Sequence, residues 1–168
     1  MEIAANSAQL ANAVKCTLAT DVLLSFGSLR FAASGWSMIP TVWPRDILVV
    51  ERVSLDRIRV GDVVLVEREG GLCAHRVIAR PDGSECGRWL TQGDAMPAPD
   101  RPVSDNNLLG RVTSVVRDGS VTAMTCKLNV IDRMIAGSVR RSFLAARILV
   151  FLHRFLQSRE ESILPCRN

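Results

Sequence analysis

The sequence predicts a mainly β fold of the α+β class, with a β-rich core and a helix at each end. Two observations lead to this prediction. Between residues 29 and 126 the chain carries short runs of β-branched and other apolar residues, separated by turn residues. Before and after this stretch, apolar residues recur at helical spacing. We therefore expect an N-terminal helix over 1–28, a β-rich domain over 29–126 and a basic helical segment over 127–168.

The N-terminal helix is expected over residues 7–26, with Ser7 as its N-cap. Apolar side chains recur there at every fourth position, which is typical of an amphipathic helix. We expect this face to pack on the core rather than to contact a membrane. Its members are Leu10, Val14, Leu18, Val22 and Phe26.

The strands of the core are predicted from their apolar runs and from the turns that bound them. Asp46 and Asp62 each open a β-branched run, as aspartates at turns commonly do. Pro-Asp-Gly-Ser at 81–84 and Arg-Asp-Gly at 117–119 predict two hairpins. The expected strands are 29–33, 46–50, 62–66, 72–78, 89–91, 109–116 and 120–125.

One long irregular loop interrupts the strands at residues 95–107. Pro97, Pro99 and Pro102 lie in it among Asp, Asn and Ser residues. Because loops of this length are usually functional in compact domains, we expect this one to contribute to a site.

The C-terminal segment is expected to be helical to about residue 156. Between 133 and 154 it holds five arginines and no acidic residue, so the rest of the chain sums to 4 − 5 = −1. The charge is therefore confined to one segment, and we expect no nucleic-acid-binding face. Four of the arginines recur every seven residues, which favours either a helix docked on the sheet or contact of 133–156 with an anionic membrane surface.

The remaining composition excludes several classes of protein. Five cysteines, odd in number and without a C-x-x-C pair, argue against zinc and against a disulfide framework. We expect no metal and no cofactor. Met1-Glu2 lacks the basic start of a signal peptide, and no apolar run reaches the ~20 residues of a membrane span. A cytoplasmic or peripherally membrane-associated protein is expected.

The most informative short segment is Gly35-Trp36-Ser37-Met38-Ile39-Pro40-Thr41. Pro40 fixes its own φ and favours an extended Ile39, while Gly35 permits close backbone approach. These residues predict a serine held on a rigid, shaped turn, as a nucleophile requires.

A nucleophilic serine needs a base and a group that orients that base. His75 lies in an apolar strand, whereas His153, the second of the two histidines, lies in the basic C-terminal segment. Asp94 and Asp100 follow His75, at a turn and in the proline-rich loop. The sequence therefore supplies a serine, a histidine and two aspartates in order.

These residues belong to a series of motifs in one order over about residues 29–116: Gly35-Trp36-Ser37-Met38-Ile39-Pro40-Thr41, Arg45-Asp46-Ile47-Leu48-Val49, Gly61-Asp62-Val63-Val64, Ala74-His75-Arg76-Val77-Ile78, Thr91-Gln92-Gly93-Asp94-Ala95-Met96 with Asp100, and Leu109-Gly110-Arg111-Val112. The series resembles the type I signal peptidase family. A histidine in the base motif, where most bacterial members carry lysine, resembles the endoplasmic-reticulum and archaeal branch. Arg45 stands where that family usually has glycine.

The resemblance implies a Ser-His-Asp endopeptidase that processes signal peptides, on the β-rich fold shared with LexA-type repressors. Ser37 would be the nucleophile, His75 the general base, and Asp100 the acid that orients it. Asp94 would support the catalytic residues without contacting the substrate, or it would exchange roles with Asp100. The substrate is expected to be a peptide or protein bound as an extra β-strand and cut at small residues. The substrate-contacting residues would be Gly35, Trp36, Met38 and Pro40.

Three departures from the family keep a second hypothesis open. Gly35 replaces a hydroxyl residue that commonly helps form the oxyanion hole, Trp36 replaces a small residue, and the usual N-terminal anchor is not seen. The alternative is a catalytically weak peptide-binding module on the same fold. We do not expect a LexA-like regulator, because about 28 residues before the first strand are too few for a DNA-binding domain.

Overall fold

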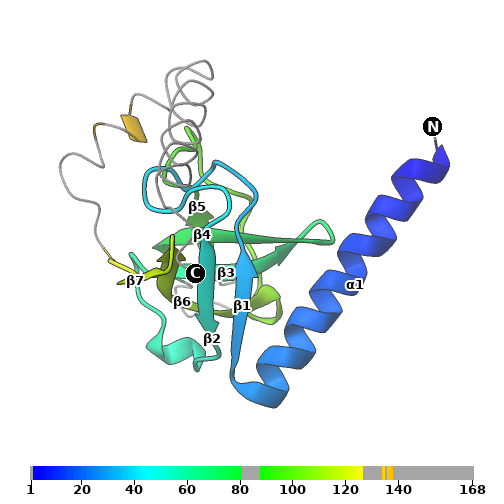
Figure 1. Cartoon of the computed structure of the whole chain (residues 1–168), viewed down its shortest axis with the longest axis horizontal. Helices are drawn as coiled ribbons and strands as arrows, with labels where there is room; N and C mark the ends of the chain where they lie inside the picture. The colour runs from blue at the N-terminus through cyan, green and yellow to red at the C-terminus, as the bar shows by residue number, and fades with distance from the viewer. Residues whose placement is uncertain (1, 81–87, 127–133, 135, 138–168) are drawn as a thin grey trace, which may run out of the picture.

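The structure, a computed structural model, describes residues 2–80, 88–126, 134 and 136–137, with side chains from residue 10 onward. Within these residues the chain forms one long helix, seven strands and two short 3-10 helices (Figure 1). The predicted mainly β, α+β class is confirmed. The elements are α1 (Glu2–Phe26), β1 (Ser28–Ala32), β2 (Ile47–Glu51), η1 (Leu55–Arg57), β3 (Val63–Arg68), β4 (Gly71–Ala79), β5 (Leu90–Gln92), η2 (Asp105–Asn107), β6 (Leu108–Arg117) and β7 (Ser120–Ala123).

The seven strands form one antiparallel sheet in the order β1-β2-β6-β3-β4-β5, with β7 paired to β6. Each strand lies within a few residues of its predicted place. The predicted strand at 89–91 is shifted to Leu90–Gln92, because Trp89 forms a separate bridge with Val103. In the β3–β4 hairpin, Val64 pairs with His75 and Val63 with Arg76. Because successive side chains of a strand point to opposite faces, His75 and Arg76 lie on opposite faces of β4.

The turns explain why the strands begin where they do. The carboxylates of Asp46 and Asp62 accept hydrogen bonds from the backbone N–H groups of Trp43 and Arg59, at 2.7 and 2.9 Å. Arg45 has φ of 82°, a left-handed conformation that strongly favours glycine. The Pro-Asp-Gly-Ser turn predicted at 81–84 lies outside the described residues.

Two core clusters occupy opposite faces of β3. Val63 and Leu65 belong to the first, and Val64 and Val66 to the second, and all four side chains are fully buried. The alternation follows from the two-residue period of a strand, and it explains why this run is apolar without interruption. The first cluster also contains Leu23, Met38, Val42, Leu48, Val50, Val112 and Val115, and the second Ile58, Val77, Trp89, Val103 and Leu108.

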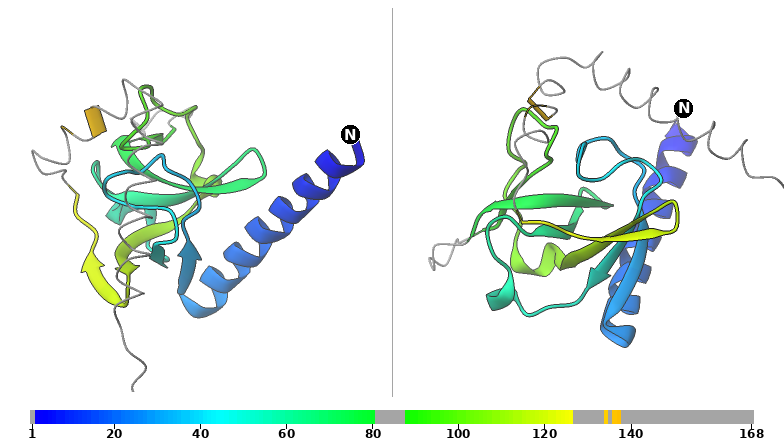
Figure 2. Two further views of the ribbon diagram at one scale, coloured as in Figure 1. Left: turned by 45° about the horizontal axis from the view of Figure 1, so that its top comes forward. Right: turned by 60° about the vertical axis from the view of Figure 1, so that its left-hand side comes forward.

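Helix α1 differs from its prediction at its start and in its buried face. It begins at Glu2, so Ser7 lies inside the helix and is not its N-cap. Leu10, Val14 and Leu18 are exposed. The buried side chains of the helix are instead Cys16, Ala19 and Leu23, and Figures 1 and 2 show its N-terminal part extending away from the sheet.

Helical geometry accounts for the error. Residues four apart are rotated by about 40° around a helix, so the predicted stripe winds through about 160° between Leu10 and Phe26. No single surface can cover such a stripe. The spacing 16, 19, 23 keeps its three side chains within a much narrower arc, and Leu23 reaches the first core cluster.

Most of the C-terminal segment, and with it the predicted helix and its arginine stripe, lies outside the described residues. Within the described part of the chain, no helix is both long enough and apolar enough to cross a bilayer.

Candidate active site

Ser37 lies on a tight turn between β1 and β2. The Ile39 N–H donates to the Trp36 carbonyl at 3.2 Å, and the Val42 N–H donates to the Met38 carbonyl at 2.9 Å. Met38, Ile39 and Val42 are buried, so apolar side chains hold the turn on the sheet. Met38 was expected to contact substrate, but its side chain belongs to the first core cluster and is only 3% exposed. It therefore anchors the turn.

The structure brings Ser37, His75 and Asp100 into one chain of hydrogen bonds. Ser37 Oγ lies 2.9 Å from His75 Nε2, and His75 Nδ1 lies 2.6 Å from Asp100 Oδ2. The three residues come from the serine turn, from β4 and from the loop after β5. An N–H on Nδ1 donates to the carboxylate, which leaves Nε2 free to accept the serine proton. This arrangement has the connectivity of a nucleophile, a base and an orienting acid.

Asp100 is kept ionised by its neighbours. Burial raises the pKa of its carboxyl, but hydrogen bonds from His75 and Thr91, together with the positive charge of Arg68, more than offset this and lower the pKa below its usual value. Thr91 Oγ1 donates to Oδ2 at 2.7 Å, and the Thr91 carbonyl accepts the Asp100 N–H at 2.8 Å. A carboxylate at this position stabilises an imidazolium.

Asp94 occupies a different place, on the far side of β4. Its two oxygens accept bonds from Arg76 Nε and Nη2, both at 2.8 Å, and its Oδ2 also accepts the Thr41 hydroxyl. Arg76 continues to the carbonyls of Gly61 and Thr125, at 2.7 and 2.9 Å. Of the two sequence alternatives, Asp100 therefore faces the imidazole and Asp94 braces the serine turn against β4.

Gly93 lets the turn before Asp94 dock on the nucleophile. A Cβ on Gly93 would lie 2.6 Å from the Ser37 carbonyl oxygen and 3.0 Å from Ser37 Cβ. The neighbouring Ala95 N–H donates to the same carbonyl at 2.8 Å. Only glycine permits this approach, which fixes the backbone of Ser37 relative to the acid-bearing loop.

Gly35 is exposed, and a Cβ on it would meet nothing within 4 Å. Its missing side chain is therefore not required by packing. Within the described part of the chain, the N–H of Ser37 donates no hydrogen bond to the protein. That N–H is a candidate donor to an oxyanion, and no hydroxyl at position 35 adds a second one.

This geometry predicts that Gly35→Ser raises kcat for peptide cleavage, by up to about tenfold, because it adds a donor where negative charge develops. Gly35→Ala is the matched control, since it adds the Cβ without the hydroxyl. Steady-state kinetics on a small-residue peptide provide the measurement. An equal effect of both substitutions would show that the hydroxyl has no such role.

Sequence reasoning missed two arginines of the site. Arg76 follows His75 directly, and a charged residue in an apolar strand is a signal that a buried partner exists. Arg68 lies at the end of β3, and no spacing rule links it to Asp100. Among the described residues, His, Cys, Asp and Glu side chains form no group of three suited to hold a metal ion.

No protein-family model matches the chain, and no curated protein matches it significantly.

Proposed function

We propose that the protein is a serine endopeptidase that resembles signal peptidase I and cleaves extended peptides at small residues. The observation that carries this proposal is the hydrogen-bonded chain from Ser37 Oγ through His75 to Asp100. A serine hydroxyl, an imidazole and a carboxylate in this order are the requirements of nucleophilic peptide hydrolysis.

The proposed reaction uses these three side chains in turn. His75 Nε2 accepts the proton of Ser37 Oγ as the oxygen attacks the carbonyl carbon of the scissile bond. The imidazolium, stabilised by Asp100, then gives that proton to the leaving amine as the carbon–nitrogen bond breaks. A water molecule then attacks the acyl-serine ester while His75 Nε2 accepts its proton. The imidazolium gives this proton to Ser37 Oγ as the bond between that oxygen and the acyl carbon breaks, which releases the carboxylic acid and restores the serine.

The free edge of β1 supports binding of the substrate as a strand. β1 is the terminal strand of the sheet and pairs only with β2 among the described strands. It runs directly into the turn that carries Ser37, so a peptide added to this edge would lie beside the nucleophile. Trp36 and Pro40, both half-buried on the turn, are the candidate contacts for its side chains.

Covalent labelling tests the proposal. A fluorophosphonate, which phosphonylates activated serines with loss of fluoride, is expected to add one mass adduct, on Ser37, with peptide mapping to locate it. Ser37→Ala should take up none. Failure of the native protein to react, or a modified residue elsewhere, would contradict the assignment.

One observation favours a second candidate, a peptide-binding module with little catalysis. Gly35 supplies no side-chain donor for an oxyanion, and losing one donor commonly lowers rates by about 10²–10³. Hydrolysis of a simple activated ester separates the two functions, since a module without catalysis leaves the ester intact.

The proposal includes a location in the cytoplasm or at the surface of an anionic membrane. The seven-residue recurrence of Arg133, Arg140, Arg147 and Arg154 supports membrane contact through residues 133–156. The arginines would add roughly 1 kcal/mol each, so such binding should weaken with salt.

A further inference from the structure

The acid of the candidate triad lies on a segment that has no regular structure. Pro97, Pro99 and Pro102 surround Asp100 in the loop between β5 and η2. Backbone bonds hold this loop at a few points, among them the Asp100 N–H to the Thr91 carbonyl and the mutual pair between Trp89 and Val103. A carboxylate on such a loop needs further contacts if its oxygen is to stay within bonding distance of His75.

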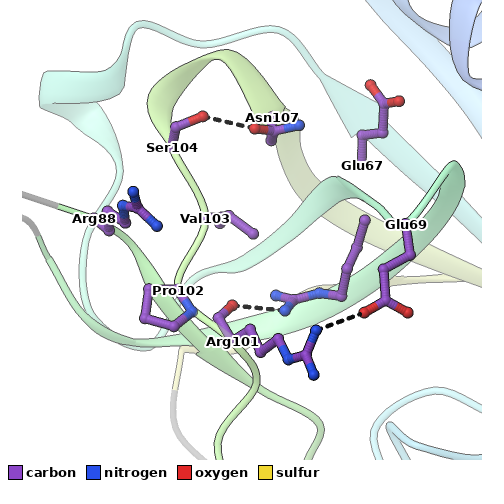
Figure 3. A pocket seen from close by; sticks show the side chains of 9 residues that line it. Glu67, Glu69, Arg88, Arg101, Pro102, Val103, Ser104 and Asn107 are labelled. Atoms are coloured by element: carbon purple, nitrogen blue, oxygen red, sulfur yellow. Dashed lines mark hydrogen bonds and ion pairs between the residues drawn. The ribbon is translucent and has the colours of Figure 1, made fainter.

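Arg68 supplies contacts on both sides of Asp100. Its Nη1 donates to the carbonyl of Arg101, the next residue, at 2.6 Å. Its Nη2 lies 3.2 Å from Thr91 Oγ1 and 3.7 Å from Asp100 Oδ2. One planar guanidinium therefore fixes the backbone after the acid and also faces the acid itself. Arg68, Glu69 and Arg101 are among the residues that line a surface hollow. Figure 3 shows this hollow, in which the side chain of Arg101 reaches Glu69.

The hydroxyl of Thr91 transmits a second effect of Arg68. Thr91 Oγ1 accepts a hydrogen bond from Arg68 and donates its single proton to the Asp100 carboxylate, which can only accept. The oxygen that receives this bond is Oδ2, the same atom that accepts His75 Nδ1. Arg68 thereby holds the Thr91 hydroxyl in place and puts a positive charge 3.7 Å from the oxygen that orients the base.

A purely structural role explains Arg68 less well. Its Nε is buried and has no hydrogen-bond partner within the described part of the chain. An unsatisfied buried donor costs stability, and an apolar residue would fill the same space without that cost.

We propose that Arg68 is a positioning residue for the reaction of Ser37 and His75, acting through Asp100 and Thr91. The inference rests on the proposed peptidase function. It assigns to Arg68 the task of holding the Asp100 carboxylate in the orientation in which Oδ2 accepts the His75 Nδ1 proton.

Kinetics of paired variants provide the first test. Arg68→Met is expected to lower kcat roughly tenfold, the size of coupling found within one hydrogen-bond network, with KM unchanged. The kcat of Arg68→Lys should lie between those of Arg68→Met and the native protein, because lysine keeps the charge but cannot donate two hydrogen bonds in the planar geometry of a guanidinium. Arg101→Met is the matched control, since it removes an exposed arginine of the same hollow and keeps the carbonyl that Arg68 binds.

A double-mutant cycle with Asp100 separates positioning from general damage. If Arg68 acts through Asp100, Arg68→Met should have little further effect in an Asp100→Asn background. An undiminished tenfold loss in that background, or an equal loss in Arg101→Met, would overturn the proposal.

A spectroscopic measurement keeps the test independent of activity. In protein labelled with ¹⁵N-histidine, neutral His75 is expected to carry its proton on Nδ1. Arg68→Met should shift the population toward the Nε2–H tautomer, and Arg68→Lys, the milder change, should show a smaller shift. An unchanged tautomer in both folded variants would overturn the role of Arg68. Absence of turnover by the native protein would instead contradict the proposed function.

Discussion

Replacing Ser37 by alanine is expected to abolish peptide cleavage while the protein remains folded. Loss of the nucleophile removes the covalent step, and in Ser-His-Asp peptidases such a loss can reach about 10⁶-fold in kcat. Ser37 is partly buried and its hydroxyl bonds His75, so removal of the hydroxyl should change the free energy of unfolding by only about 1 kcal/mol. Mass spectrometry of a small-residue peptide, together with urea unfolding, measures both quantities.

Ser34→Ala is the matched control for this experiment. Ser34 lies on the same turn, is exposed, and makes no bond to His75 within the described part of the chain. It should cleave at the native rate. Cleavage by the Ser37 variant at a comparable rate would remove Ser37 from the mechanism, whereas loss of activity in both variants would indicate damage to the turn.

The strands could be predicted because local rules determine them. Asp46 and Asp62 bond backbone N–H groups three residues earlier, so each turn depends on residues within one short segment. The apolar run of β3 follows from burial on both faces. Helix α1 shows where such rules fail, since its length was underestimated and its buried face depends on where Leu23 meets the sheet.

The candidate site was predictable only as far as motifs reach. Ser37, His75 and the two aspartates were identified, but their order along the chain does not determine which acid faces the histidine. That choice depends on the strand pairing, which directs His75 and Arg76 to opposite faces of β4. Arg76 bonds Asp94 and thereby leaves Asp100 as the partner of His75. Arg68 was missed for the same reason. It lies 32 positions before Asp100 in the sequence, and no local pattern predicts a contact over such a separation.

Replacement by asparagine is expected to lower mainly kcat at Asp100 and mainly stability at Asp94. Asp100→Asn should lower kcat by about 10³–10⁴, because an amide at this position can favour the wrong tautomer of the imidazole. The stability of the Asp100→Asn variant should fall less than that of the Asp94→Asn variant. The lowered pKa of Asp100 means that its carboxylate stabilises the fold fully above the unfolded value of about 3.9 and loses this effect as the pH falls through the lower folded value. The difference in stability between native protein and this variant should therefore shrink only below about pH 4.

Asp94→Asn should instead cost stability, about 3 kcal/mol, because it leaves the guanidinium of Arg76 buried without its counter-charge. The side chains of Arg76 and Asp94 are only 10% and 3% exposed, so water cannot replace the lost partner. Activity per folded molecule should fall much less than in Asp100→Asn. Urea unfolding at pH 7 and kcat measured on the folded fraction separate the two effects. Equal and small losses of kcat would leave at most a Ser-His dyad, and a reversed pattern would make Asp94 the orienting acid.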